Sequence, residues 1–497
     1  MQADIIITNH ALLCTDMFHQ YQYLPSYDKV IIDEAHHFEE TASKRYGLKL
    51  DYVHMLYALN QIGSSTSDSW LGQVLYDYAE MTDTALLQRW DDHFEKAKHE
   101  IDDLFRLLFQ YVLEKNKYDQ SLSDIGRIQY RLQAADETET KWKRIKEMVN
   151  RLSTLLHELC NDLVSLQQID LDGQTETQLQ NHKSILESFY DNLQELFLKT
   201  DDTSVVKWVE IEAKGAKNAV YMYSEPIDMS QLLSKEFFEV KHSVILTSAT
   251  LTMNNSFSFM KKRLGIPENR LESKMIPSPF SYKDQVQLLI PNDFPDIRYG
   301  NQDAFIEAST EAILSLAEIT SGRMLVLFTS YDMLKKAYYL LRDAIVDQAY
   351  MLIAQGITSG SRSRLKKNFQ SFDKAILLGT SSFWEGVDIP GEDLSCLVIV
   401  RLPFEAPGHP LFEAKSEKLK QEGKNAFFDL SLPNAVIRFK QGFGRLIRTQ
   451  HDRGIVFVCD ARIMKSRYGT FFTKSIPEVS TYYDTTTKVL EKARQWF

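Results

Sequence analysis

The sequence predicts an α/β protein with two parallel sheets and a helical domain inserted into the first of them. Its short apolar runs are continuous rather than alternating, which is typical of strands covered on both faces. Between the second and third runs, residues 52–200 are nearly free of proline and glycine and carry apolar residues at helical spacing. In the second half, strand-like and helix-like segments alternate. Together these observations indicate two doubly wound sheets separated by a helical insertion.

The first sheet is predicted from three apolar runs. Asp4–Thr8 is rich in isoleucine, Lys29–Ile32 ends in the acidic pair Asp33 and Glu34, and Ser243–Leu246 ends in small hydroxyl residues. Each run reads as a buried strand. A short helix is expected over Ala11–Phe18.

The insertion is predicted to be all-helical from Tyr52 to Thr200. Its apolar stripes, such as Leu104 to Leu113 and Met148 to Leu159, have helical spacing, and acidic and basic residues alternate between them. We therefore expect residues 1–48 and 203–264 to form the first α/β domain, 49–202 the insertion, and 265–497 the second α/β domain.

The second domain follows a segment that contains Pro267, Pro277 and Pro279. Its predicted strands are Gln285–Ile290, Met324–Thr329, Tyr350–Ile353, Ala375–Gly379, Cys396–Val400 and Ile455–Cys459. Its predicted helices are Ala304–Ile319, Tyr331–Ala344, Arg362–Phe372 and Ala435–Leu446. Ser330 is expected to cap the second of these helices.

Composition narrows the class of protein. The chain has 497 residues, 44% hydrophobic and 25% charged, with no run long enough to cross a membrane. Its first residues lack the basic region and the cleavage site of a signal peptide, so we expect none there. The four cysteines are scattered along the chain and form no CxxC pair. This spacing argues against a metal cluster held by cysteines alone within this chain, and it fits a reducing cytoplasm. The net charge of −11 does not favour nucleic-acid binding, but a local basic groove would suffice.

Asp33-Glu34-Ala35-His36 directly follows a predicted strand. Ligands bind beyond the carboxyl ends of parallel strands, so these carboxylates would face a crevice. There, one carboxylate can hold Mg²⁺ while the next polarises an attacking water. The plainer alternative is an acidic cap on the following helix.

Two further segments follow predicted strands. Thr247-Ser248-Ala249-Thr250 could relay position between loops by hydrogen bonds, or simply cap a helix. The segment from Gly379 to Asp388 has glycines that allow close backbone approach, hydroxyls that can contact phosphate, and acids suited to a ribose or an arginine. It could equally be a surface loop.

Gln441 to Arg448 is the most informative segment. We predict that it places Arg445 and Arg448 on one side of a helix, with Gln441 one turn earlier. Arginines in this pattern can reach the γ-phosphate of a nucleotide. A solvated helix face is the alternative, but Gly442 and Gly444 would cost such a helix about 2 kcal/mol, so close packing explains them better.

Taken together, these segments resemble the motifs of superfamily 2 helicases of the XPD-like branch, and within it the bacterial DinG type. Asp33–His36 resembles motif II, Ser248–Thr250 motif III, Trp384–Asp388 motif V and Gln441–Arg448 motif VI. The resemblance extends over essentially the whole chain. It implies two RecA-like motor domains, the first incomplete, with the insertion corresponding to the arch domain over the translocating strand.

The resemblance also implies roles for individual residues in ATP hydrolysis. Asp33 would coordinate Mg²⁺, Glu34 would activate water, and Arg445 and Arg448 would sense phosphate and act as the arginine finger. The residues implied at the nucleotide are His36, Glu385, Gly386, Asp388 and Gln441. Those implied in coupling to DNA are Ser248, Ala249, Thr250, Thr380 and Ser381.

The sequence departs from the family in one important respect. No G-x-x-x-x-G-K-[ST] phosphate-binding loop occurs in it; Gly423-Lys424 lacks the other positions of that pattern. In the family this loop precedes motif II, so we expect it, with any iron–sulfur cysteines or exonuclease domain, upstream of this sequence. The missing half-domain could be joined in one longer protein or be a separate chain.

The leading hypothesis is thus an ATP-dependent DNA helicase motor that acts on single-stranded, forked or hybrid nucleic acid, in repair or replication. A second is a catalytically dead single-strand-binding or scaffold module that keeps the fold. An unrelated nucleotide-binding enzyme would require the motif order to be coincidental. The sequence leaves the DNA path unmapped; Lys261-Lys262-Arg263 and Lys366-Lys367 are candidates for it, but such lysines are usually just solvated.

Overall fold

The computed structural model describes residues 4–78, 84–116, 127–166, 171–199, 203–212, 215–216, 218–297, 300–345, 350–384, 393–405 and 408–497. The chain divides into two compact units, which are described separately. The first comprises residues 1–25, 40–229 and 408–414, and the second comprises 26–39, 230–407 and 415–497.

Long amphipathic helices dominate the first unit. Its helices are α1 (His10–Phe18), α3 (Tyr52–Ile62), α4 (Trp70–Asp77), α5 (Thr84–Lys115), α6 (Thr140–Leu166) and α7 (Gly173–Leu193). The predicted apolar stripes form their shared core: Leu104 and Leu108 of α5 and Leu152 and Leu156 of α6 are fully buried. None of the described helices is both long and apolar enough to span a bilayer.

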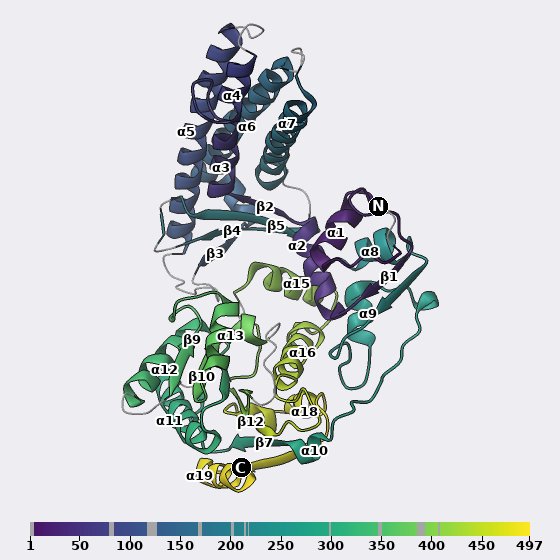
Figure 1. The fold of residues 1–497 in the computed structure, drawn as a ribbon, viewed down its shortest axis with the longest axis vertical. Helices are drawn as coiled ribbons and strands as arrows, with labels where there is room; N and C mark the ends of the chain where they lie inside the picture. The colour runs from purple at the N-terminus through teal and green to yellow at the C-terminus, as the bar shows by residue number, and fades with distance from the viewer. Residues whose placement is uncertain are drawn as a thin grey trace. The chain divides into compact units, whose positions relative to one another are not determined.

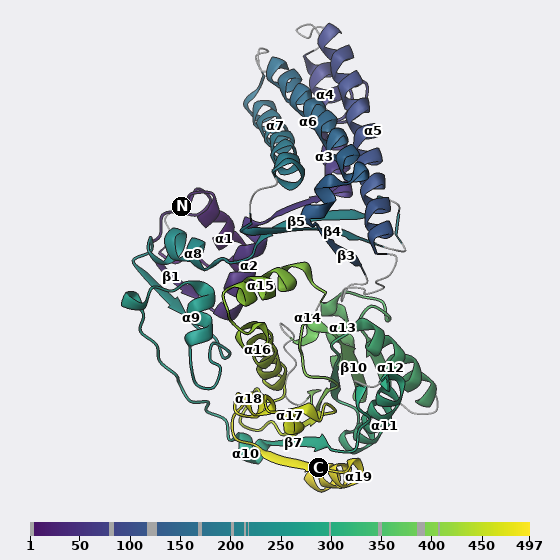
Figure 2. The same ribbon diagram turned by 180° about the vertical axis from the view of Figure 1, so that it is seen from behind.

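The insertion is not all-helical, contrary to prediction. In the described part of the chain its helices stand on an antiparallel sheet with the order β2-β5-β4-β3 (Figure 2). The strands are β2 (Leu48–Asp51), β3 (Ile128–Arg131), β4 (Val205–Ile211) and β5 (Val220–Pro226). β2 and β3 have four residues each, too few to show a period of two in the sequence. Their partner strands are also distant in the chain: β5 lies about 170 residues after β2, and β4 lies about 80 residues after β3.

Residues 4–8 form no strand, so the prediction for Asp4–Thr8 is wrong. Ile5 and Ile7 are 80% and 94% exposed. An apolar run becomes a strand only where a neighbouring strand accepts its hydrogen bonds, and the described residues supply none here.

The second unit contains a short parallel pair of strands, β1 (Lys29–Ile32) and β6 (Ser243–Leu246), as predicted. Lys29 pairs with Ser243 and Ile32 with Leu246. Helices α2 (Phe38–Tyr46), α8 (Ser230–Leu233) and α9 (Ser258–Leu264) lie near the pair in the chain. One face of the pair is uncovered, because the facing residues Ile31 and Ile245 are 71% and 54% exposed.

The large sheet of the second unit is entirely parallel within the described residues, with the order β13-β7-β12-β11-β8-β10-β9. Six of these strands were predicted, with ends shifted by at most two residues; β13 was not. The bounds are β7 (Val286–Pro291), β8 (Met324–Leu327), β9 (Met351–Ala354), β10 (Ala375–Gly379), β11 (Cys396–Ile399), β12 (Gly454–Val458) and β13 (Ser480–Asp484).

Helices cover both faces of the large sheet (Figure 1). One core lies under α11 (Gln302–Thr320), α12 (Tyr331–Ala344) and α19 (Thr486–Trp496). The other lies under α13 (Arg362–Ser371), α14 (Ser381–Trp384), α16 (Leu432–Phe443) and α18 (Gly469–Thr473). Alternate residues of β8 enter the two cores, Val326 one and Leu327 the other. Ser330 caps α12 as predicted, accepting a hydrogen bond from the Met333 amide at 3.3 Å.

Shorter helices complete the second half. They are α10 (Tyr282–Gln285), α15 (Pro410–Gln421) and α17 (Arg462–Lys465). The connection from β11 to β12 runs through α15 and α16, and α17 follows β12. These connections place the ends of β11 and β12 side by side.

Candidate functional site

Asp33 and Glu34 lie at the carboxyl end of β1, where the adjacent strand β6 also ends. The Ala35 amide donates to the Thr247 carbonyl at 3.0 Å, and the Thr247 amide donates to the Ile32 carbonyl at 2.9 Å. The two loops therefore leave the sheet together. The Thr247 hydroxyl lies 3.4 Å from a carboxylate oxygen of Asp33, and both acids are exposed.

Glu34 has a left-handed backbone, with φ 47° and ψ 45°. This region is uncommon for residues other than glycine and costs on the order of 1–2 kcal/mol. It turns the chain sharply between β1 and the following 3₁₀ turn, Ala35–His37. Such strain persists where the surroundings hold a side chain in place, and here a hydrogen bond does so.

A network of hydroxyl and imidazole groups joins the two loops. The Ser248 hydroxyl donates to Glu34 Oε2 at 3.0 Å and lies 2.8 Å from Nδ1 of His36. The Thr250 hydroxyl lies 3.1 Å from the same His36 nitrogen, and His36 and Thr250 are buried. Ser248 and Glu34 are 214 residues apart in the chain, and their hydrogen bond brings the Asp33–His36 and Ser248–Thr250 segments together. Ala249 is exposed and has no polar side-chain group.

Gln441 lies near the end of α16, and its side chain is 8% exposed. Neither its amide nitrogen nor its amide oxygen has a hydrogen-bond partner among the described residues. Leaving such a group unpaired costs about 1–3 kcal/mol for each lost partner, so a buried unpaired amide needs an explanation. A bound ligand would supply the missing partners.

Close packing explains Gly442, as predicted, but not Gly444, whose Cβ would meet only the Lys440 and Gln441 carbonyls at 3.4 and 3.6 Å. A Cβ at Gly442 would lie 2.9 Å from the Trp384 ring. That ring is buried, and its Nε1 donates to the Phe328 carbonyl at 3.2 Å. The tryptophan is therefore a fixed wall against which α16 packs.

Arg445 and Arg448 are not on the helix, contrary to prediction. α16 ends at Phe443, and both arginines lie in the following loop. Arg445 is half-buried, with its Nε 3.4 Å from the Trp384 carbonyl, and Arg448 is exposed. Beyond the helix, the Asp452 carboxylate fixes the loop backbone: it accepts the Arg448 amide at 2.6 Å and the Thr449 amide at 2.7 Å.

The loop that carries these arginines is held by residues that the sequence analysis missed. Gln285 donates to the carbonyls of Thr449, Gln450 and Asp452 at 2.8–3.2 Å. Burial raises the pKa of Asp452, but hydrogen bonds from Thr449 and Arg448 outweigh it and lower that pKa. Asp452 lies nine residues after the end of α16 and two residues before β12, so no local spacing marked it as a cap.

Thr380 follows β10, but it is buried, and both its amide and its hydroxyl donate to Gln355 Oε1, at 2.9 and 3.0 Å. Gln355 follows β9 and was also missed, although its place at a strand end could have marked it. Ser381 begins α14. Glu385, Gly386 and Asp388 lie outside the described residues.

A buried carboxylate, Glu39, connects three elements of the second unit. It accepts hydrogen bonds from Arg263 of α9 at 2.8 Å and from Lys415 of α15 at 2.9 Å. Arg263 also reaches Asn434 of α16 at 3.3 Å. Burial alone would raise the pKa of Glu39, but the charges of Arg263 and Lys415 lower it to about 2. Arg263 of the predicted basic run is therefore engaged within the protein.

The described residues fit one side of a magnesium nucleotide. Mg²⁺ takes one or two protein carboxylates plus phosphate oxygens and waters, which suits the exposed Asp33. Gln441 could meet polar groups of a nucleotide. The phosphate cradle, however, has no counterpart in the sequence. Among the described residues, no group of three or more His, Cys, Asp or Glu side chains is placed to hold a metal.

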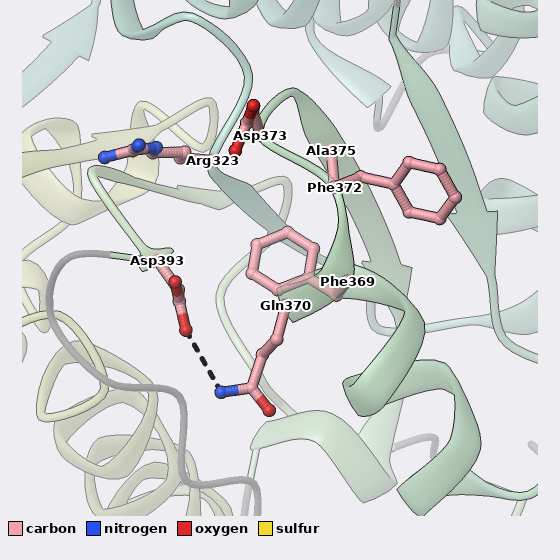
Figure 3. A pocket seen from close by; sticks show the side chains of 7 residues that line it. All are labelled: Arg323, Phe369, Gln370, Phe372, Asp373, Ala375 and Asp393. Atoms are coloured by element: carbon pink, nitrogen blue, oxygen red, sulfur yellow. Dashed lines mark hydrogen bonds between the residues drawn. The ribbon is translucent and has the colours of Figure 1, made fainter.

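A small pocket lies at the other edge of the large sheet, by the amino ends of β8 and β10. Figure 3 shows Gln370 donating to Asp393 across it, at 3.0 Å. It is lined by Arg323, Phe369, Gln370, Phe372, Asp373, Ala375 and Asp393. Because the predicted site residues follow the carboxyl ends of the strands, we assign this pocket no part in the site.

Comparison with known proteins gives concordant results. Residues 313–479 match the family of helicase C-terminal domains. The chain is 37% identical over 493 residues to the 3′-5′ exonuclease DinG of Bacillus subtilis (strain 168), covering 97% of this chain and 52% of that protein. It is 28% identical to the ATP-dependent DNA helicase YoaA of Haemophilus influenzae, covering 97% of this chain and 68% of that protein. The chain thus spans about half the length of the first relative.

The fold agrees with these sequence matches. A solved XPD helicase aligns with a TM-score of 0.52 at 14% identity, covering 94% of this chain and 72% of that one. At this identity the likeness concerns the fold alone. The chain is thus similar in sequence to the DinG and YoaA proteins, and its fold is similar to that of an XPD helicase.

Proposed function

We propose that the chain is the motor part of an ATP-dependent DNA helicase, which couples ATP hydrolysis to movement along single-stranded DNA in repair or replication. The observation that carries this proposal is the contact between two loops 212 residues apart, in which Ser248 bridges Glu34 and His36. An acidic cap on a helix would not need that bridge. The bridge is needed, by contrast, if the loop that carries the catalytic acid has to move together with the neighbouring loop.

In this proposal Asp33 holds Mg²⁺ and Glu34 orients and polarises the attacking water. The left-handed backbone at Glu34 and the hydrogen bond from Ser248 fix the carboxylate. His36 and Thr250 share the same network, so a shift of either loop would change the environment of Glu34. The network thereby couples the state of the nucleotide to the loops that follow β6.

On the large sheet, Gln441 contacts the nucleotide and Arg445 and Arg448 approach its phosphates. The loop after α16 suits this role better than a helix would, because its side chains can shift while Asp452 and Gln285 hold its backbone. Thr380 acts through Gln355, and Glu385, Gly386 and Asp388 contribute to the ribose or arginine side of the site. Ser381 and Ala249 remain assigned to DNA coupling.

In this proposal a segment outside this sequence supplies the phosphate-binding loop, which the sequence itself lacks. The open face of the β1–β6 pair supports this view, because parallel strands are normally covered on both faces and Ile31 and Ile245 are not. The completing segment is either part of a longer protein or a separate chain.

The test is ATP hydrolysis, with and without single-stranded DNA, by this chain and by a protein extended upstream. We expect DNA-stimulated turnover only in the extended protein. In it, Glu34→Gln should lower kcat by at least about a hundredfold while nucleotide binding is kept. Glu40→Gln, six residues along the chain and on the exposed side of α2, is the matched control. Unchanged turnover in Glu34→Gln would refute the role of Glu34.

A catalytically dead strand-binding or scaffold module is the second candidate. The missing phosphate loop favours it for this chain taken alone. If neither protein hydrolyses ATP but both bind single strands, this second function replaces the first.

A further inference from the structure

Arg401 directly follows β11, at the carboxyl edge of the large sheet. The Val400 amide donates to the Leu327 carbonyl at 3.1 Å, which holds the start of this loop against the end of β8. The Leu402 amide donates to Asp460 Oδ2 at 3.0 Å, which ties the loop to the end of β12. Arg401 thus extends from a backbone fixed on both sides.

The acids near Arg401 are already paired with other arginines. Asp460 binds Arg462, whose Nε lies 2.8 Å from Oδ1. Glu405 binds Arg438 of α16 at 3.0 Å. Among the described residues named here, three arginines and two carboxylates leave one positive charge over.

Arg401 itself makes no hydrogen bond or ion pair with any side chain in the described structure, although it is half-buried. Burial, followed by the nearby charge of Arg462, lowers the pKa of Arg401 against the opposing effect of Asp460. Taking a guanidinium out of water without a counter-charge is unfavourable. An anion beside it would remove that cost.

Arg401 lies beyond the carboxyl ends of β8 and β11, which is where α/β sheets bind ligands. β8 and β11 are neighbours, but their connections leave to opposite faces: α12 packs in one core and α16 in the other. Ligands bind beyond the carboxyl ends of strands at such a divergence. Arg401 and the amino end of α12 are the groups that the two strands present there, and both attract anions.

Aromatic rings extend from the same loop. The Arg462 guanidinium lies 5.6 Å from the centre of the Phe404 ring, and Phe404 stacks on Phe427 with 5.7 Å between ring centres. The next ring, Phe428, is 51% exposed. Cationic groups with adjoining aromatic rings are the usual composition of a surface that binds single-stranded nucleic acid.

We propose that Arg401 forms a phosphate-binding site at the carboxyl edge of β8, β11 and β12, which takes a backbone phosphate of single-stranded nucleic acid. This inference deepens the proposed function by naming part of the strand's path. The same chemistry could hold a phosphate of a free nucleotide, and the experiment separates the two sources.

The experiment measures binding of a fluorescent oligo-dT to the full chain by anisotropy, without nucleotide, over a series of salt concentrations. Arg401→Ala should weaken binding about tenfold and reduce the slope of log K against log salt by about 0.7. Arg401→Lys should restore most of the affinity. Arg342→Ala is the matched control, because Arg342 has the same charge but lies in the last turn of α12 and pairs with Asp343.

Two further arms identify the source of the phosphate. A neutral methylphosphonate oligonucleotide should bind the wild-type chain and Arg401→Ala equally. A fluorescent ADP should bind both equally as well; a loss confined to ADP would assign the site to the nucleotide and overturn the strand assignment. Equal oligo-dT affinity and salt slope in Arg401→Ala and Arg342→Ala, or no oligo-dT binding by the wild type, would overturn the site. These results do not depend on ATP hydrolysis, so they are separable from a failure of the proposed motor.

Discussion

The β1–β6 pair and the large sheet are built from the same kind of strand, yet only the large sheet is covered on both faces. Ile399 and Leu327 face each other across β11 and β8 and are fully buried. Ile31 and Ile245 face each other across β1 and β6 and are largely exposed. The difference lies in the neighbours that each strand has, since composition and pairing are alike.

This contrast shows how the two regions divide the work of the site. The covered sheet holds Gln441 and its loop on a fixed core. The open pair presents Asp33 and Glu34 at its end through two strands and a hydroxyl network. We therefore expect the large sheet to tolerate core changes poorly and the open pair to respond to whatever covers it.

The largest expected effect tests this difference directly. Ile399→Ala should lower the free energy of unfolding by about 2–5 kcal/mol, because it leaves a cavity in a covered sheet. Ile31→Ala should cost less than about 1 kcal/mol in this chain, since most of its side chain is already in water. Urea unfolding followed by circular dichroism measures both.

The same pair of variants sharpens the comparison in the extended protein. There the cost of Ile31→Ala should rise toward that of Ile399→Ala, because the added segment buries the isoleucine. If Ile31→Ala costs the same in both proteins, the open face is not where that segment packs.

The next effect concerns Glu39, which joins Arg263 of α9 to Lys415 of α15. Its pKa is about 2 when folded against 4.5 ordinarily, so its stabilisation is present above about pH 4.5 and is lost as the pH falls toward 2. The lost contribution is about 3 kcal/mol. Glu39→Gln should flatten stability against pH in this window. A wild-type profile with the same slope as the variant would contradict the ion pairs.

The smallest effect compares two glycines of the large-sheet site. Gly442→Ala should destabilise by about 1–3 kcal/mol, because its Cβ would press on the Trp384 ring. Gly444→Ala should change stability by less than about 1 kcal/mol: its nearest neighbour is the Lys440 carbonyl at 3.4 Å, and its φ of −65° suits alanine. Thermal unfolding of both variants checks this. Equal midpoints would mean that Trp384 can move.

Much of the fold could be predicted because its strands are buried on both faces. β10 and α12 have the predicted ends, since a continuous apolar run and a capping serine mark them locally. The antiparallel sheet of the insertion could not be predicted, because β2 and β3 pair with strands that are distant in the chain. Asp4–Thr8 failed for the converse reason: it has the apolar pattern but no described partner strand.

The site was predictable to the level of its segments rather than its contacts. The two strands that precede Asp33 and Thr247 were predicted, but the bridge from Ser248 to Glu34 depends on their lying side by side, which no local pattern states. The loop that carries Arg445 and Arg448 was not predicted either, because Asp452, which holds its backbone, looked like an ordinary polar residue. Gln355 and Gln285 act on distant backbone, and no local pattern marks such a residue.

The uncovered isoleucines also bear on how a cell would handle this chain. A contiguous exposed apolar surface on a strand pair is the feature that drives self-association and that chaperones and proteases recognise in incomplete proteins. Covering Ile31 and Ile245 would therefore hide that signal as well as complete the sheet. If a segment packs on this face as proposed, abundance in the cell would report on its presence, because chain with the two isoleucines exposed would be removed.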